Sequence, residues 1–292
     1  MNTKLLYTRN AMKLHALTLL LTSAPLFAGV SAPTSTAPQS DCVAGWTFGF
    51  DALALRPFQS EGLYTERGYD FAYRINAGYD FSDCFFTKMS YFHYDTTTVN
   101  ENLIVAPETV PTQFDGDMQA QSGDWVVGQH FRPSEQLVLS PYVGLRWAKF
   151  EENSNDTTLS VTETLGRQRH EFNGYGIVVG LDGNRSFGNN LSMYGVAKQA
   201  IVFGNTDYSQ TTTVDGTLTL NDQYSEDSVA SITEVGFGLQ YDFVMGATAA
   251  NIRAGVEGQY WAGLSGGFAS GSFSDSENVG LAGFLLGANL KF

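Results

Sequence analysis

Charged side chains recur at alternate positions inside segments that are otherwise rich in aromatic and aliphatic residues. Eight acids and six bases fall on the less apolar face of such segments: Asp51, Asp70, Arg74, Asp80, Lys88, Asp124, Arg146, Asp182, Lys198, Glu234, Asp242, Arg253, Glu257 and Lys291. Side chains of this kind can neutralise one another as ion pairs inside a protein. They can also line a narrow water path and select ions by charge. The two interpretations are not exclusive, and the sequence leaves both open.

Proton transfer is the other chemistry that the residues could support. Beyond residue 28 the only histidines are His93, His130 and His170. His170 precedes Glu171, but adjacent residues of a strand point to opposite faces, so this pair cannot share a proton directly. The sequence has no Cys/His cluster, phosphate-binding loop or dinucleotide fingerprint. We therefore expect no catalytic residues, no metal site and no cofactor.

The elements that hold the charged residues should be β-strands, because polarity alternates with a period of two. In residues 251–260, for example, Ile252, Val256 and Tyr260 oppose Arg253 and Glu257. An unpaired charge facing lipid would cost about 2–4 kcal/mol, so the charged face must point inward. Ten segments are predicted as strands: 45–57, 68–82, 85–98, 116–131, 138–152, 170–186, 191–205, 228–243, 251–262 and 278–292.

The lengths of the connections between these strands alternate. In order they have 10, 2, 17, 6, 17, 4, 22, 7 and 15 residues. A membrane barrel with both termini in the periplasm has this pattern of long outer loops and tight inner turns. We predict an all-β fold, a transmembrane antiparallel up-and-down β-barrel of ten strands with long acidic extracellular loops. Eight or twelve strands remain as alternatives if a segment has been merged or split.

The first part of the chain has the features of a targeting segment. A basic stretch, a short apolar run and the small-residue site Leu26-Phe27-Ala28 predict a signal peptide over residues 1–28. Residues 29–44 then form a flexible periplasmic leader, and residues 45–292 form a single barrel. Cleavage would leave 13 basic and 30 acidic residues, a net charge of −17. Nucleic acid is therefore excluded as a partner, and we expect outer-membrane lipid and ions or small solutes instead.

Two cysteines lie at the predicted periplasmic rim on neighbouring strands. Cys42 precedes the first strand, and Cys84 lies in the tight turn between the second and third. Because the periplasm is oxidising, we predict a disulfide between Cys42 and Cys84.

Several segments resemble the Legionella major outer membrane protein family of pore-forming barrels. They are GWTFGFDALALRP (45–57), YDFAYRINAGYDF (69–81), SPYVGLRWAKFE (140–151), NGYGIVVGLDGNRSFGNNLSMYGVAKQAIVFG (173–204), GFGLQYDF (236–243) and GFLLGANLKF (283–292). The resemblance implies a location in the bacterial outer membrane and channel activity. It also raises bridging of the cysteines between chains, and hence a homo-oligomer, as an alternative. It brings no catalytic residues.

Two functions therefore stay open at this point. The first is an outer-membrane pore that gives passive passage to ions or small solutes through a narrow charged lumen. The second is a closed structural or adhesion barrel that acts through its extracellular loops, chiefly the acidic segments 99–115 and 206–227.

Overall fold

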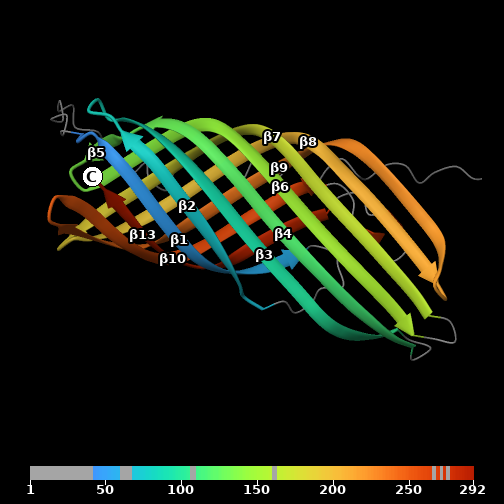
Figure 1. Ribbon diagram of the computed structural model, residues 1–292. Helices are drawn as coiled ribbons and strands as arrows, with labels where there is room; N and C mark the ends of the chain where they lie inside the picture. The colour runs from blue at the N-terminus through green and yellow to red at the C-terminus, as the bar shows by residue number, and fades with distance from the viewer. Residues whose placement is uncertain are drawn as a thin grey trace, which may run out of the picture. The chain divides into compact units, whose positions relative to one another are not determined.

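Ten antiparallel strands close on themselves to form a barrel, as the sequence predicts (Figure 1). The computed structural model describes residues 42–59, 68–105, 110–159, 163–264, 268–269, 272–273 and 277–292. The predicted signal peptide and nearly all of the predicted leader lie outside these residues. Among the described residues no helix is long and apolar enough to cross a membrane.

Each strand of the barrel pairs with the next one along the chain, and the last strand pairs with the first. The strands are β1 (Gly45–Gln59), β2 (Asp70–Asp80), β3 (Phe85–Val105), β4 (Val110–Gln129), β6 (Leu137–Leu159), β7 (Glu163–Gly188), β8 (Leu191–Val214), β9 (Thr217–Met245), β10 (Thr248–Leu264) and β13 (Glu277–Lys291). The short β5 (Phe131–Ser134) pairs with β6 outside this ring. A separate small pair is formed by β11 (Phe268–Ala269) and β12 (Ser272–Phe273).

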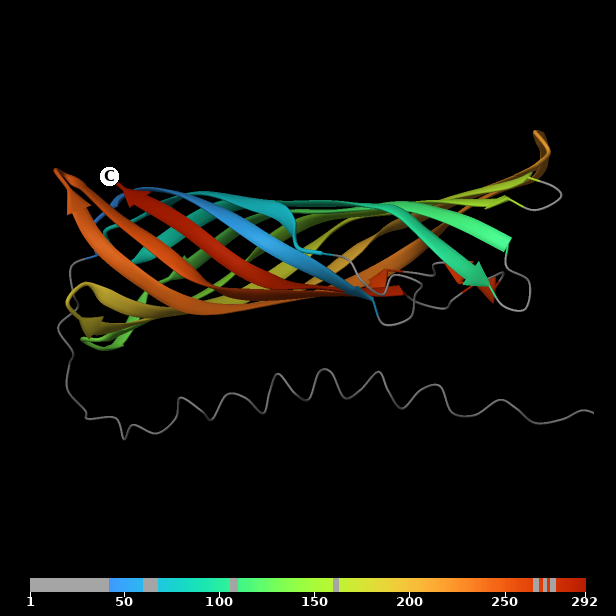
Figure 2. The same cartoon turned by 90° about the horizontal axis from the view of Figure 1, so that it is seen from below.

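The two ends of the barrel differ. At one end, called the turn end, short connections join β2 to β3, β7 to β8 and β9 to β10, and the C-terminus lies there too (Figure 1). At the opposite loop end, the strands from β3 to β9 rise further than β1 and β13 (Figures 1 and 2). β7, β8 and β9 have 26, 24 and 29 residues. Since 9–11 residues suffice to cross a bilayer, these strands must project beyond it.

The limits of the strands at the loop end differ from those expected. The connection predicted over residues 206–227 is a regular hairpin, in which β8 and β9 continue and meet at a two-residue turn. Asp215 and Gly216 form this turn with φ of 49° and 75°. Asp-Gly tolerates such positive angles and is a strong hairpin signal, so the turn was readable from the sequence. The parts of β8 and β9 beyond the membrane were not predicted as strands, because their residues are mostly polar. A strand in water needs no apolar outward face.

An apolar belt surrounds the barrel on its outward face. Phe71, Tyr175, Phe237 and Leu286 each expose more than 60% of their surface. So large an exposed apolar surface is unfavourable in water and favourable against hydrocarbon. The belt therefore marks the part of the barrel that spans the membrane.

One polar residue within the belt finds its partners on the same face. The Gln199 amide donates to the Ser231 hydroxyl at 2.9 Å and accepts from the Thr233 hydroxyl at 2.6 Å. These side-chain hydrogen bonds lower the cost of placing a glutamine toward lipid.

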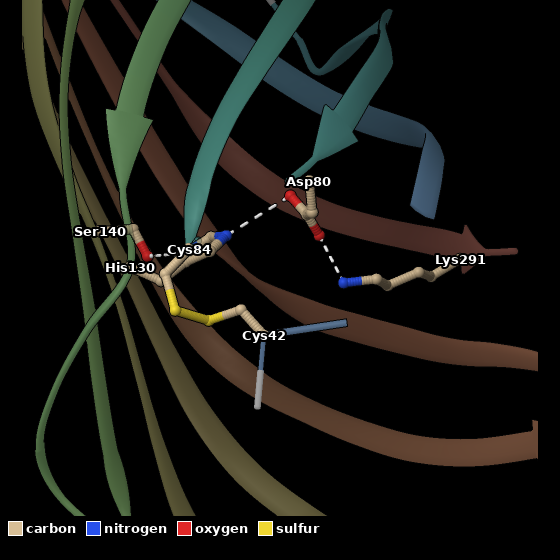
Figure 3. Close-up of a disulfide and its surroundings, with 6 residues drawn as sticks. All are labelled: Cys42, Asp80, Cys84, His130, Ser140 and Lys291. Atoms are coloured by element: carbon tan, nitrogen blue, oxygen red, sulfur yellow. Dashed lines mark hydrogen bonds and ion pairs between the residues drawn. A yellow bond between two sulfur atoms is a disulfide. The ribbon is translucent and has the colours of Figure 1, made fainter. Parts of the chain in front are cut away.

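The predicted disulfide between Cys42 and Cys84 is confirmed (Figure 3). The Cα atoms of the two residues are 5.1 Å apart. Cys84 adopts a φ of 68° in the tight turn, and its carbonyl accepts from the backbone N–H of His130 at 2.9 Å. The bond therefore ties the chain before β1 to the turn between β2 and β3.

We expect Cys42→Ser to lower the free energy of unfolding by about 2–5 kcal/mol, because the disulfide restricts the unfolded chain. Ser82→Ala, at an exposed position in the same turn, is the control and should have almost no effect. Denaturant unfolding in detergent measures both. Peptide mapping without reductant should yield a Cys42–Cys84 peptide from the monomer, and recovery of these cysteines only in cross-linked dimers would contradict the intramolecular bond.

Candidate functional site

A cluster of eight charged side chains lies inside the barrel, level with the middle of β1 and β2. It contains four acids and four bases, so its formal charge is zero. We call it the charge cluster, and its members are Asp51, Arg74, Asp124, Arg146, Lys198, Glu234, Arg253 and Glu257. They come from β1, β2, β4, β6, β8, β9 and β10. All eight belong to the fourteen positions that the sequence singled out.

Ion pairs connect all eight residues into one network. Its bases reach acids on strands that are not neighbours: Arg74 on β2 donates two hydrogen bonds to Glu257 on β10, at 2.5 and 2.8 Å. Arg146 on β6 contacts Glu234 on β9 at 2.5 Å. Contacts between strands this far apart in the sheet must cross the lumen.

Further pairs complete the network on either side of these crossings. Arg146 also holds Asp124 through two hydrogen bonds of 2.6 and 2.7 Å. Lys198 lies 3.0 Å from Glu234 and 3.5 Å from Asp124. Paired guanidinium and carboxylate groups with several hydrogen bonds compensate each other for lost hydration. The same side chains unpaired would be costly at this depth.

Another ion pair of the charge cluster joins Asp51 and Arg253. The Arg253 guanidinium donates hydrogen bonds of 2.7–3.1 Å to the Asp51 carboxylate. Gly287 of β13 makes room for this ion pair. A Cβ atom at this position would lie 3.1 Å from Nε of Arg253 and closer still to the Asp51 carboxylate. Glycine is therefore needed here for the close approach of the ion pair.

The charge cluster closes the lumen among the described residues. Side chains that line a path wide enough for water must be partly exposed. Seven side chains of the charge cluster have exposed fractions of only 0–9%, and that of Arg253 is 17%. The space that remains among them is about 20 Å³, room for little more than one water molecule.

An apolar layer fills the lumen on the loop-end side of the charge cluster. Its large members are fully buried and include Leu53, Leu55, Met118, Phe150, Phe172, Ile232, Trp261 and Leu281. Hydrogen bonds along β10 join the two layers: Trp261 donates to Gln259 at 3.2 Å, and Gln259 donates to Glu257 at 2.9 Å. The period-two pattern marks these residues only as inward, so the layer that they form was not predicted from the sequence.

A polar region occupies the lumen on the turn-end side. Lys88 pairs with Asp182 at 2.9 Å, and both side chains are partly exposed. A separate recess of about 350 Å³ at this end is lined by Thr47, Asp242 and Lys291 among others. Asp70 lies apart from these, bonded to Thr96 at 2.5 Å. The turn-end side of the lumen is therefore polar and partly exposed, whereas the charge cluster is almost fully buried.

A serine, a histidine and a carboxylate form a hydrogen-bonded chain at the turn-end rim (Figure 3). The Ser140 hydroxyl lies 2.8 Å from Nδ1 of His130, and Nε2 of His130 lies 3.4 Å from Asp80. These residue types suit nucleophilic catalysis. However, Lys291 already pairs with Asp80 at 2.6 Å, and Ser140 is only 7% exposed. These side-chain contacts therefore connect β2, β6 and β13 at the rim.

The other two histidines lie far from this rim. His93 is on the outward face, where its ring lies 5.3 Å from that of Tyr73. His170 is buried near the loop end, stacked on Tyr208 at 4.8 Å. Its neighbour Glu171 belongs to the outward ion pairs instead. Within the described part of the chain, no group of three or more His, Cys, Asp or Glu side chains is placed to hold a metal ion.

Glu234→Gln should destabilise the barrel by about 3–5 kcal/mol, because Arg146 and Lys198 would keep their buried charges with less compensation. The control is Asp227→Asn on the same strand, where the side chain is exposed and the change should stay within about 0.5 kcal/mol. Denaturant titration of both variants in lipid vesicles measures the difference. Equal unfolding midpoints would mean that the cluster contributes nothing to stability.

Three of the solved structures that match the chain are remote in sequence. A major outer membrane protein from Thermus thermophilus is 13% identical, with a TM-score of 0.40 over 86% of this chain and 100% of that one. The outer membrane protease OmpT from Escherichia coli is 8% identical, with a TM-score of 0.40 over 90% and 99%. The toluene transporter TodX of P. putida is 10% identical, with a TM-score of 0.36 over 87% and 90%.

No curated protein matches the chain in sequence. A family pattern does match, over residues 38–292, which include the whole barrel. The protein therefore belongs to the family described as Legionella pneumophila major outer membrane protein precursor.

Proposed function

We propose that this outer-membrane protein is a barrel with a closed lumen, and that it acts at the cell surface through the strands that rise beyond the apolar belt. The observation that carries the proposal is the charge cluster, whose side chains cross the lumen and expose almost no surface. The apolar layer beside it adds a second barrier, since ions lose their hydration among apolar side chains.

The proposal includes an orientation with the turn end and both termini in the periplasm. Short inner turns and long outer connections are the rule for bacterial outer-membrane barrels. The disulfide at the turn end suits this side, because the periplasm oxidises thiols.

The β8–β9 hairpin is the strongest candidate for contacts with a partner. Beyond the belt it exposes Leu218, Leu220 and Tyr224 together with the acidic Asp222 and Glu226. Apolar side chains grouped on an exposed, polar-rimmed hairpin are typical of interaction surfaces. A partner with basic and apolar groups would complement this surface.

Passive passage of ions or small solutes is the second candidate function. It is favoured by the kind of barrier at the charge cluster: in the described part of the chain this barrier consists of side chains held by ion pairs, and no strand or helix of that part passes through the lumen there. Side chains can move aside where a backbone segment cannot. A pore of this kind would conduct only after the pairs separate.

Conductance across a planar bilayer distinguishes the two candidates. The unmodified protein should give no stepwise currents at neutral pH, because both layers of the lumen are closed. The variant that combines Arg74→Ala, Glu257→Ala and Trp261→Ala removes a matched ion pair and one large apolar side chain, and should conduct. The control variant Ile75→Ala removes the neighbouring outward side chain and should stay silent.

Stepwise currents from the unmodified protein would overturn the closed lumen and support the pore. In that case Glu234→Gln and Glu257→Gln should be compared with it for cation preference. A changed preference in folded protein would assign the two carboxylates to ion selection, and an unchanged one would leave them as structural fillers.

Shortening the hairpin tests the surface role. Deletion of residues 206–226, with an Asp-Gly turn joining the register partners Asn205 and Asp227, should leave the barrel folded while adhesion of expressing cells to immobilised matrix proteins is lost. The folded state is checked by its unheated mobility on gels. Unchanged adhesion would exclude the hairpin as the contact surface.

A further inference from the structure

An apolar hollow of about 570 Å³ lies on the outward face of the barrel, within the belt. It extends across β2, β3, β4, β6 and β7, and its main lining residues are Met89, Tyr91, Trp125, Leu145, Trp147 and Tyr175. Its surface is nearly all carbon, and it faces the membrane. An occupant must therefore be a hydrocarbon chain or the side chains of another protein.

A missing side chain creates the hollow. Tyr91, Gly123, Trp147 and Tyr175 face one another in register across four strands, so Gly123 interrupts a row of aromatic residues. A Cβ atom at Gly123 would meet only Trp147 at 3.6 Å and the carbonyl of Ser90 at 3.9 Å. Packing therefore does not require glycine here, and the space is open to an external group.

Polar side chains border the hollow on its loop-end side. In the next outward row, Gln121 accepts from the Tyr91 hydroxyl at 3.0 Å, and Asn173 accepts from the Trp147 indole at 2.9 Å. The same row contains Lys149, which faces both of these residues in register. An amphiphile with its chain in the hollow would place its head group among these residues.

Two cations lie at this border, held by two carboxylates. Lys149 contacts Glu151 at 3.1 Å and Glu171 at 2.9 Å. Arg169 contacts the same acids at 3.0 and 2.7 Å, through one terminal nitrogen only. About half of the Arg169 side chain is exposed. Since guanidinium has five N–H donors, Arg169 retains outward donors for a phosphate, and the carboxylates fix its position.

We propose that the hollow binds one acyl chain of a phosphorylated glycolipid of the outer leaflet, whose phosphate contacts Arg169 and Lys149 and whose sugar hydroxyls contact the bordering amides. The glycolipid, rather than a phospholipid, follows from the proposed orientation, which places the loop end outside. The inference therefore rests on that part of the proposed function.

Native mass spectrometry of the full chain, extracted from outer membranes in mild detergent, tests the site. The unmodified protein should retain one glycolipid. Gly123→Leu fills the hollow and should reduce the retained fraction about tenfold, as expected for a loss near 1.4 kcal/mol. The matched control is Gly258→Leu on the outward face of β10, where a Cβ atom also meets only ordinary contacts, and retention there should be unchanged.

The head-group contact needs separate variants. Arg169→Gln and Lys149→Gln should each weaken retention of the phosphorylated glycolipid, and should not affect binding of the same glycolipid after enzymatic dephosphorylation. Equal retention by Gly123→Leu and the unmodified protein would overturn the hollow as the site. Retention of phospholipid alone would overturn the glycolipid assignment.

A separate experiment tests the proposed orientation of the barrel in the membrane. Leu218→Cys, at the loop end, should react with a membrane-impermeant maleimide on intact cells. Reaction without retained glycolipid would overturn this site and leave the proposed orientation standing. Reaction only after the membrane is opened would overturn both.

Discussion

Hydrocarbon offers no partner to a backbone N–H or C=O group, so a strand in the bilayer must be bonded along both edges. Pairing of β1 with β13, in register from Thr47 and Lys291 to Gln59 and Val279, satisfies that requirement by leaving no edge in the ring. Closure with only ten strands makes a narrow interior. The inward side chains must then fill it, and the outward ones must suit lipid. The remaining features of the molecule follow from this division of the two faces.

The interior resolves a conflict between charge and burial. Arginine and glutamate at this depth are unfavourable alone, but Arg74 with Glu257 and Arg146 with Glu234 neutralise each other across the lumen. The apolar layer next to them removes water from the loop-end side. A polar region remains open at the turn end. The barrel thus combines a polar, partly exposed turn end with a buried interior at the charge cluster and the apolar layer.

Much of this could be predicted from the sequence, because alternation of polarity has a period of two in most membrane-crossing segments. Its limits are instructive. The parity that places Asp51 inward also places Leu53 and Leu55 inward, yet only cross-strand register shows that such residues meet in one layer. The chain Ser140–His130–Asp80 was not predictable, since its members are separated by many residues and meet only at the rim. The long β8–β9 hairpin was missed for a different reason: outside lipid, a strand no longer needs an apolar face.

Because the charge cluster is neutral and buried, a change in ionic strength should affect the surface of the protein more than the cluster. After removal of the predicted signal peptide, the fourteen positions predicted to face inward take eight of the 30 acids and six of the 13 bases, so almost all of the excess negative charge belongs to other parts of the chain. Exposed charges are screened over about 8–10 Å at moderate salt, whereas buried pairs are screened little. A change in the concentration of the surrounding electrolyte therefore alters the repulsion among surface carboxylates and hardly affects the ion pairs of the charge cluster.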